Sequence, residues 1–149
     1  MDIVIQPNKI LRKKLDHIAQ ITPEITRLVS DMKKKMVEAG GVGLAANQVG
    51  LDLQIFVIDK KLAIENEVPE AYINPEMTEY SKDEAEMEEG CLSIPNYWHQ
   101  IKRAKKIKLK AIDESGKKIK IKAKGFLARV LQHEFDHLQG MLIKDRISK

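Results

Sequence analysis

Apolar residues recur at helical spacing in the first third of the chain. Thr22 and Pro23 are residue types that begin helices, and after them apolar side chains stand three or four positions apart. Gly40 and Gly41 follow, and glycine is expected to end a helix. We therefore predict an amphipathic N-terminal helix between Pro23 and these glycines. Its core-facing residues are Ile25, Leu28, Val29, Met32, Met36 and Val37.

Alternation of apolar and polar residues predicts strands farther along the chain. Segment 51–59 (LDLQIFVID) predicts a strand with alternate residues on one face, and 71–74 (AYIN) predicts a short strand. Residues 105–111 and 118–123 alternate strictly, with 113–116 (DESG) between them as a turn, so they predict a β-hairpin with its lysines in water. The residues expected to face the core are Leu51, Leu53, Ile55 and Val57 in the first strand, and Ile107, Leu109, Ile119 and Ile121 in the hairpin.

The last predicted element is a helix near the end of the chain. Glycines at 125 and 140 bracket the segment GFLARVLQHEFDHLQG, which holds good helix formers. A helix, several short strands and a second helix together favour the α+β class. We expect mostly antiparallel or mixed strands packed around this C-terminal helix. The length of 149 residues fits a single domain, residues 1–149.

Charge is unevenly distributed along the chain, whose formal net charge is +4. Residues 102–124 hold eleven basic side chains, and residues 83–89 hold five acids. We interpret both segments as solvated faces, since sheet geometry already places the hairpin lysines in water. The alternative for the basic segment is a patch that binds nucleic acid or the ribosome. It lacks the interleaved aromatic residues of single-strand binders, and we expect no sequence-specific nucleic-acid partner.

The compartment is predicted from what the sequence lacks. No apolar run approaches the ~18 residues of a membrane span, and the N-terminal segment does not have the apolar block of a signal peptide. We therefore expect a cytoplasmic protein with no membrane partner. The single cysteine, Cys91, excludes an internal disulfide.

The stretch QHEFDHLQG predicts a metal site on the last helix. His133 and His137 stand four residues apart, about 40° around a helix, so both imidazoles are able to meet one cation. Glu134 lies on the flank of that face and is placed to handle a metal-bound water. Phe126 and Val130 fall on the same face and would form an apolar wall. We expect Leu127, Leu131 and Leu138 to pack in the core, and Asp136 to orient a neighbouring group.

A third ligand has to come from upstream of this helix. The pattern begins like that of the metzincins, but Ile143 stands where their third histidine would be, and no glutamate follows. The candidates are Cys91, His99 and His17, of which the two histidines better fit surface or packing positions. A thiolate is a strong ligand for a borderline-soft divalent ion. Cys91 with two histidines would leave a fourth position open, as in catalytic sites.

With these residues assembled, the sequence resembles the peptide deformylase family. Three motifs carry the resemblance, in order: GVGLAANQ (41–48), EGCLS (89–93) and QHEFDHLQG (132–140). The resemblance implies a hydrolase that removes the N-formyl group from the formyl-methionine of newly made polypeptides and releases formate. It implies Cys91, His133 and His137 as ligands of one divalent ion. That ion is Fe(II) in most members, and zinc, nickel or cobalt are able to occupy the site.

The resemblance also implies roles for other residues. Glu134 would act as general base and then as general acid. The side-chain amide of Gln48 and the backbone N–H of Leu92 would stabilise the oxyanion. The glycines of the first motif also have a physical interpretation, since Gly41 and Gly43 would let a peptide's backbone approach closely, with Val42 beside it. Phe126, Val130 and the aliphatic part of Arg129 would form the pocket for the methionine side chain.

Two departures from the family pattern bear on partners. Many bacterial members continue past the metal helix into a further helix that docks on the ribosome, whereas this sequence ends at Lys149. Ribosome docking would then use another surface, for which the basic hairpin is the candidate. Trp98 stands where many members have arginine-containing sequences, so we expect it to alter the grip on later substrate residues. An ion pair between Glu89 and Arg103 is also expected.

Two other functions compete with deformylation. The first is a zinc endopeptidase of another H-E-x-x-H type, which Ile143 and the missing downstream glutamate disfavour and which leaves Cys91 without a role. The second is a binding module with a structural metal, in which His99 or His17 would close the fourth coordination position. An exchangeable water on the metal would argue against this second function.

Overall fold

The computed structural model describes residues 1–147, so the last two residues of the predicted domain 1–149, Ser148 and Lys149, lie outside the described part. Three α-helices occur in residues 1–147: α1 (Pro23–Glu38), α2 (Lys60–Glu65) and α3 (Gly125–Leu138). The strands are β1 (Gly43–Ala45), β2 (Ile55–Ile58), β3 (Ala71–Tyr80), β4 (Glu84–Cys91), β5 (Ile94–Ala104), β6 (Lys106–Ile112) and β7 (Lys118–Lys124). Short 3₁₀ helices are η1 (Lys9–Arg12), η2 (Ala46–Val49) and η3 (Ile143–Arg146).

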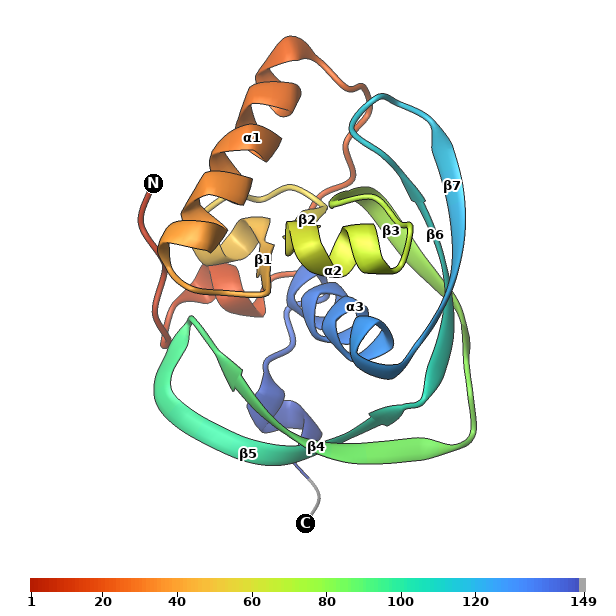
Figure 1. Ribbon diagram of the computed structural model, residues 1–149. Helices are drawn as coiled ribbons and strands as arrows, with labels where there is room; N and C mark the ends of the chain where they lie inside the picture. Colours follow the sequence, from red (N-terminus) through yellow and green to blue (C-terminus); the bar gives the residue numbers. More distant parts are fainter. Residues whose placement is uncertain (148–149) are drawn as a thin grey trace.

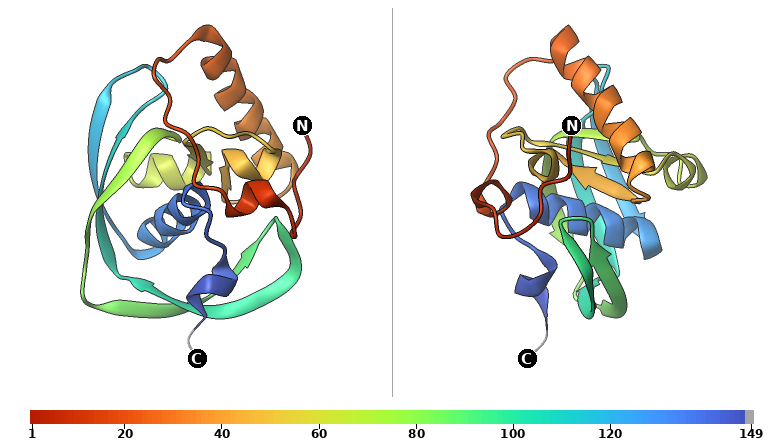
Figure 2. Two further views of the ribbon diagram at one scale, coloured as in Figure 1. Left: turned by 180° about the vertical axis from the view of Figure 1, so that it is seen from behind. Right: turned by 90° about the vertical axis from the view of Figure 1, so that its left-hand side faces the viewer.

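Two antiparallel sheets wrap around α3, which lies at the centre of the molecule (Figure 1). One sheet has five strands in the order β1-β2-β3-β6-β7, and the other consists of β4 and β5. The side view of Figure 2 places α1 and the β4–β5 hairpin at opposite ends of the molecule, with α3 between them. The predicted α+β class with a C-terminal helix inside the strands is confirmed, and the strands pair antiparallel.

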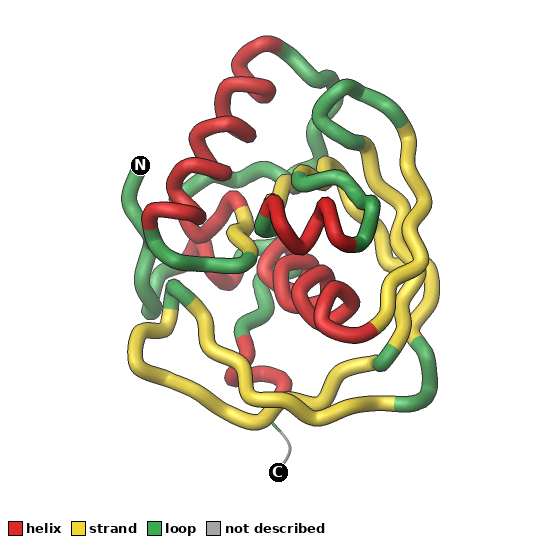
Figure 3. The backbone as a smooth tube through the Cα atoms, viewed as in Figure 1, coloured by secondary structure: helices red, strands yellow, loops and turns green. Residues whose placement is uncertain are grey.

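The two sheets are joined by strands that continue past a bend. In Figure 3, β3 leads into β4 and β5 leads into β6, each across a short loop. Backbone hydrogen bonds hold the bend, from the Ser81 N–H to the Lys106 carbonyl (2.9 Å) and from the Lys105 N–H to the Asp83 carbonyl (2.9 Å). Sequence reasoning missed β4 and β5 because acidic residues are depleted in strands and no clear alternation marks them. The bend carries the end of β4 around to α3.

Helix α1 forms as predicted, with one exception at its end. The Thr22 hydroxyl accepts a hydrogen bond from the Ile25 N–H, so Thr22 is the N-cap. Val29, Met32 and Met36 are buried. Val37 is 70% exposed, contrary to the prediction, because it lies about 100° around the helix from Met36 and leaves the apolar stripe. None of the helices in residues 1–147 combines the length and apolar character that crossing a membrane requires.

The strand predicted at 51–59 is shorter than expected and is buried on both faces. Strand β2 covers only Ile55–Ile58, and each of its residues is buried. Both α1 and α3 contact β2, so the expected alternation between core and solvent is wrong here. Leu51 and Leu53 are half-buried in the loop before the strand.

The predicted hairpin is confirmed as β6 and β7. Leu109 lies opposite Ile121 and Ile107 lies opposite Ala123, all facing the core. Ile119, nearer the turn, is half-buried. The lysines between these residues lie on the outer face, as the alternation predicted.

Candidate metal centre

Helix α3 and the end of β4 bring three metal-ligating side chains together. Nε2 of His137 lies 3.2 Å from Nε2 of His133 and 3.4 Å from Sγ of Cys91. One ligand atom from each of the three residues lies within 4.8 Å of the others. On the other faces of α3, Leu127, Leu131 and Leu138 are buried in the core as predicted. The helix therefore supplies two donors from one face, and the bent hairpin supplies the third.

The spacing of these donors fits one ion. Metal–ligand bonds of about 2.0–2.3 Å at tetrahedral angles separate donor atoms by about 3.3–3.7 Å. Nδ1 of His133 donates a hydrogen bond to Oε1 of Glu89 (2.9 Å), which leaves the Nε2 lone pair free for a cation. The Cys91, His133 and His137 group is therefore able to hold one metal ion. His17 and His99, the other candidates for third ligand, are exposed and lie outside this group.

The electrostatics of the cluster also favour a cation. Burial alone would lower the pKa of His133, but the Cys91 thiol, the Glu134 charge and the Glu89 hydrogen bond outweigh it and raise that pKa to about 10. Burial and the nearby charge of His133 hold the pKa of His137 well below its usual value. One positive charge is therefore stabilised among these donors, and a divalent ion would replace the proton that supplies it.

Glu134 lies beside the cluster in a buried position. Its Oε2 is 4.0 Å from Nε2 of His133, and its Oε1 has no hydrogen-bond partner within residues 1–147. Burial raises the pKa of its carboxyl to about 7. A Cβ atom placed on Gly43 would lie 2.5 Å from Oε2, so glycine is required there to leave room for the carboxylate. Gly43 thus has a role that its predicted contact with a peptide did not include.

The first motif is held against the cluster by amide side chains. The Ala45 N–H donates to Oε1 of Gln48 (3.0 Å), which turns Nε2 of Gln48 toward Oγ of Ser93 (3.2 Å) and Sγ of Cys91 (3.5 Å). Nδ2 of Asn47 donates to the His137 carbonyl (2.7 Å), which ties η2 to α3. Sequence reasoning singled out Gln48 and missed the contacts of Asn47 and Ser93, which depend on segments far apart in the chain.

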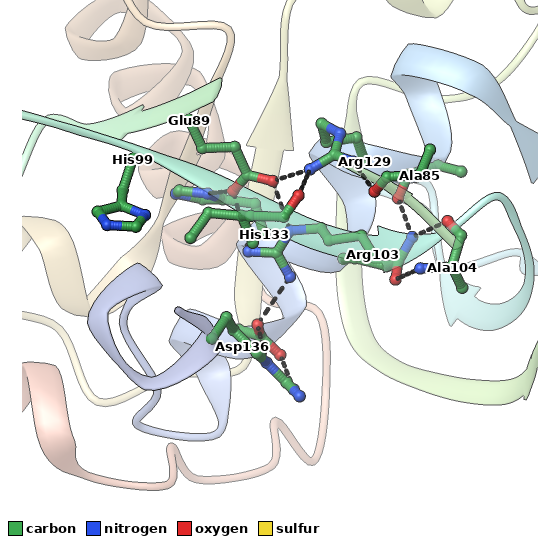
Figure 4. A network of polar contacts seen from close by, with 12 residues as sticks. Ala85, Glu89, His99, Arg103, Ala104, Arg129, His133 and Asp136 are labelled. Carbon is green, nitrogen blue, oxygen red and sulfur yellow. Dashed lines mark hydrogen bonds and ion pairs between the residues drawn. The ribbon is translucent and has the colours of Figure 1, made fainter. Parts of the chain in front are cut away.

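A buried network of charges lies behind His133 (Figure 4). Glu89 accepts two hydrogen bonds from Arg103, with Nε at 2.7 Å and Nη2 at 3.0 Å, so the expected ion pair is present. Nη1 of Arg103 donates to Asp136 (2.9 Å), and Asp136 therefore orients Arg103. Burial would raise the pKa of Glu89, but hydrogen bonds from His133 and Arg103 outweigh it and lower that pKa to about 2. Glu89 is consequently ionised and holds the His133 ring in place.

The Arg129 guanidinium is also part of this network, which the sequence did not indicate. It donates to Glu89, to the Ile101 carbonyl (3.0 Å) and to the Ala85 carbonyl (2.7 Å). Because these contacts fix the guanidinium, the methylene groups of Arg129 have a defined position.

A cavity of about 560 Å³ opens onto Cys91, His133 and Glu134. The predicted pocket residues line it: Val42, Gly43, Leu92, Phe126, Arg129 and Val130. Val130 is buried, whereas Phe126 and Val42 are exposed at the rim. Trp98 also lines the cavity, where it lies opposite Gly90 and leaves no space for a side chain at that position. The cluster therefore lies at the base of an open, mainly apolar cleft.

Comparisons of sequence and of structure both indicate one family. The family model described as polypeptide deformylase matches residues 1–149. Peptide deformylase of Thermodesulfovibrio yellowstonii is 41% identical over 148 residues, 99% of this chain and 89% of that protein. Peptide deformylase 1 of Clostridium perfringens is 46% identical over 138 residues, 93% of this chain and 91% of that protein.

Solved structures agree with these sequence matches. The crystal structure of peptide deformylase from Thermotoga maritima has a TM-score of 0.91 and 39% identity, covering 99% of this chain and 97% of that one. The crystal structure of a peptide deformylase from Synechococcus elongatus in complex with actinonin has a TM-score of 0.93 and 36% identity. The match covers 99% of this chain and 80% of that one. The chain therefore belongs to the polypeptide deformylase family of metal-dependent enzymes, which remove the N-formyl group from newly made polypeptides.

Proposed function

We propose that this chain deformylates formyl-methionine peptides at the cluster of Cys91, His133 and His137. The observation that carries the proposal is the juxtaposition of these three donors with the buried carboxyl group of Glu134, at the base of the cavity. Three protein ligands leave one coordination position open for chemistry. Formate and a free amino terminus are the products.

We propose Fe(II) as the resident ion. A thiolate and two imidazoles suit iron, zinc, nickel and cobalt alike, so the donor set supports a divalent ion without selecting one. When bound, the ion supplies Lewis acidity and lowers the pKa of water.

Glu134 is proposed as the proton carrier. It would take a proton from the attacking water and return it to the departing amine. Its buried position, which raises its pKa to about 7, suits a group that both accepts and donates a proton near neutral pH. Gly43 supports this role by leaving space for the carboxylate.

Gln48 and Leu92 are proposed to stabilise the oxyanion of the tetrahedral intermediate. The Gln48 amide is pre-oriented by the Ala45 N–H, so its N–H groups point toward the cluster. The backbone N–H of Leu92 follows Cys91 directly. Donors fixed before reaction avoid reorganisation as the negative charge develops.

The substrate is proposed to lie in the cleft with its methionine side chain against apolar atoms. Phe126, Val130 and the methylenes of Arg129 would form that pocket. Gly43 begins β1, and Val42 directly precedes it. Strand β1 ends the five-stranded sheet and has a partner on only one side within residues 1–147. A peptide adding to this edge would bring its first residue to the cluster.

The two competing functions fit less well. A structural metal site needs a fourth protein ligand, and His17 and His99 lie outside the group. A zinc endopeptidase of another H-E-x-x-H type has no role for Cys91, whose sulfur lies in the group. We also propose that the enzyme is cytoplasmic. It would meet its substrates, the newly made polypeptides, at the ribosome.

Formate release from a short formyl-methionine peptide tests the proposed function. The protein is purified without oxygen and its metal content is counted. We expect formate from the formylated peptide, no cleavage of the same peptide without its formyl group, and about one metal per chain. Internal cleavage of the unformylated peptide would instead support the endopeptidase, and bound metal without formate would contradict deformylation.

A further inference from the structure

The outer face of the β6–β7 hairpin carries lysines in directly facing pairs. The strand register places Lys106 opposite Lys124, Lys108 opposite Lys122 and Lys110 opposite Lys120. All six side chains are exposed, and Lys118 continues the row on β7. We call these seven residues the lysine ladder: Lys106, Lys108, Lys110, Lys118, Lys120, Lys122 and Lys124.

Acids adjoin the ladder on one side, where β3 places Glu76 opposite Lys110 and Glu79 opposite Lys108. Like charges directly opposite one another destabilise an antiparallel pair. Within residues 1–147, Lys108 forms the ladder's one ion pair, with Glu79 at 3.0 Å. The acids of the hairpin turn have other partners, since Asp113 bonds within the turn and Glu114 pairs with Lys33. Strand β7 has no strand on its other side, so the positive charge of the ladder is concentrated along the β7 row.

Protection of a sheet edge explains only part of the ladder. Lysines on an edge strand prevent pairing with other chains, and β7 is the last strand of its sheet. Strand β6, however, lies between β3 and β7, so its lysines protect no edge. A solvated face needs polar residues but does not need lysine at each position. The facing pairs therefore point to a ligand with repeated negative charges.

We propose that the lysine ladder docks the enzyme on double-helical RNA through its phosphates. Alternate residues of an antiparallel strand lie about 6.8 Å apart, so the ladder presents two parallel rows of cations. Lysine contacts phosphate as a point charge, without reading base sequence. No aromatic side chain stands among the outward residues of β6 and β7, so this face offers no stacking platform for unpaired bases.

The shape of the surface agrees with a phosphate row. A groove of about 390 Å³ is lined by Lys106, Lys108, Lys122 and Lys124, together with Ser81 and with Glu79, whose carboxylate pairs with Lys108. The choice of RNA over DNA rests on the proposed function, because newly made polypeptides emerge from an RNA-rich particle.

Docking here would leave the catalytic cleft open. Lys124 precedes α3 directly, two residues before Phe126 at the rim of the cavity. None of the ladder residues lines that cavity, and the groove shares no residue with it. RNA bound to the ladder would therefore hold the cleft near the RNA surface without entering it.

The test measures binding of the metal-loaded enzyme to a fluorescent RNA duplex of about 20 base pairs over a range of salt concentrations. The ladder variant combines Lys110→Gln, Lys120→Gln and Lys122→Gln. The matched control combines Lys14→Gln, Lys34→Gln and Lys60→Gln, three exposed lysines elsewhere that also lower the charge by three. Formate release from a formyl-methionine tripeptide is measured on all three proteins.

We expect the ladder variant to bind the duplex at least about tenfold more weakly at low salt. The slope of log K against log salt should fall in magnitude by about 2 to 3. The control should bind like the parent, and tripeptide turnover should be unchanged in both. No binding by the parent, equal weakening of both variants, or tighter binding of single-stranded RNA of the same length would overturn the proposal. Absence of formate release would count against the proposed function and leave the RNA result to stand separately.

Discussion

At the scale of single residues, the chemistry of the site depends on space as much as on functional groups. The Glu134 carboxylate occupies the place that a side chain at position 43 would fill. Burial then raises its pKa to about 7. The missing Cβ of Gly43 and the raised pKa of Glu134 therefore have one origin, the close approach of β1 to α3.

Gly43→Ala should lower turnover without removing the metal. Its Cβ would lie 2.5 Å from Oε2 of Glu134, so the carboxylate has to move from its place beside the cluster. We expect kcat to fall by at least about tenfold. The measurement is kcat for a formyl-methionine peptide together with metal content. The control is Gly43→Ala in a Glu134→Ala background, where the carboxylate is gone and no further loss is expected; an equal loss in both backgrounds would contradict the explanation.

Substitutions at Glu134 and at Cys91 should affect turnover and metal content differently. Glu134→Ala removes the proton carrier and leaves the three donors, so we expect full metal content and a kcat lower by about 10²–10⁴-fold. Cys91→Ser removes one donor, so metal and activity should fall together. Metal analysis and formate release on the same preparations provide the comparison. A fully active Glu134→Ala enzyme would exclude Glu134 as the base.

At the scale of elements, the bent double strand places the centre. Strands β4 and β5 turn away from β3 and β6 at residues 81–83 and 105, and so reach the far side of α3 (Figure 1). Cys91 and Glu89 lie near the tip of this hairpin and face His137 and His133. A straight continuation of β3 would leave the thiol on the other sheet, away from the helix.

The lysine ladder should lower the stability of its own hairpin. Lys120→Glu changes the rung with Lys110 from like to opposite charges. We expect the free energy of unfolding to rise by about 0.5–1 kcal/mol at low salt, and the gain to shrink at high salt. Denaturant unfolding at both salt concentrations measures it. Lys34→Glu, on an exposed position of α1, is the control, and an equal gain there would indicate an effect of net charge alone.

At the scale of the whole molecule, one buried network joins the two-stranded sheet and η3 to the central helix α3. Glu89 on β4 bonds Arg103 on β5 and both Arg129 and His133 on α3 (Figure 4). Arg146 of η3 adds a two-point contact to Asp136, with distances of 3.0 and 2.8 Å. Ionised Glu89 is therefore a condition for the hairpin, the helix and the end of the described chain to fit together.

Low pH should lower the free energy of unfolding, because Glu89 becomes protonated. Its pKa is lowered from 4.5 to about 2 in the folded state, so its contribution to stability is present above about pH 4.5 and is lost as pH falls toward 2. The shift corresponds to about 3 kcal/mol. Denaturant unfolding of metal-free protein between pH 6 and pH 2 measures it. Glu89→Gln should flatten this dependence, whereas Glu86→Gln, on the exposed face of β4, should leave it unchanged; a similar slope in all three proteins would exclude Glu89 as the cause.

The parts of the fold and of the site that could be predicted from the sequence are those that depend on residues close together in the chain. The caps and apolar stripe of α1, the strict alternation of β6 and β7, and the spacing of His133 and His137 each depend on neighbours in the chain. Strand β4 could not be predicted, because its acidic residues are unusual in a strand. Glu89 is held there by Arg103 and Arg129, and the other acids face solvent. The prediction that Val37 faces the core was wrong for a local reason, since Val37 lies one residue beyond Met36 and outside the apolar stripe of α1.

The sequence by itself determined the helix that carries two imidazoles and a carboxylate on one face, because helical periodicity orders residues four apart without outside help. It also determined the hairpin and its lysines, since alternation along a strand is equally local. The sequence favoured Cys91 as the third ligand, and the tertiary structure brings its sulfur to those imidazoles while His17 and His99 stay outside the group. Only the tertiary structure decided that Arg129 is fixed by Glu89 and that Gly43 makes room for Glu134. These contacts join segments dozens of residues apart, and their geometry depends on the bend between the two sheets, which no local pattern in the chain records.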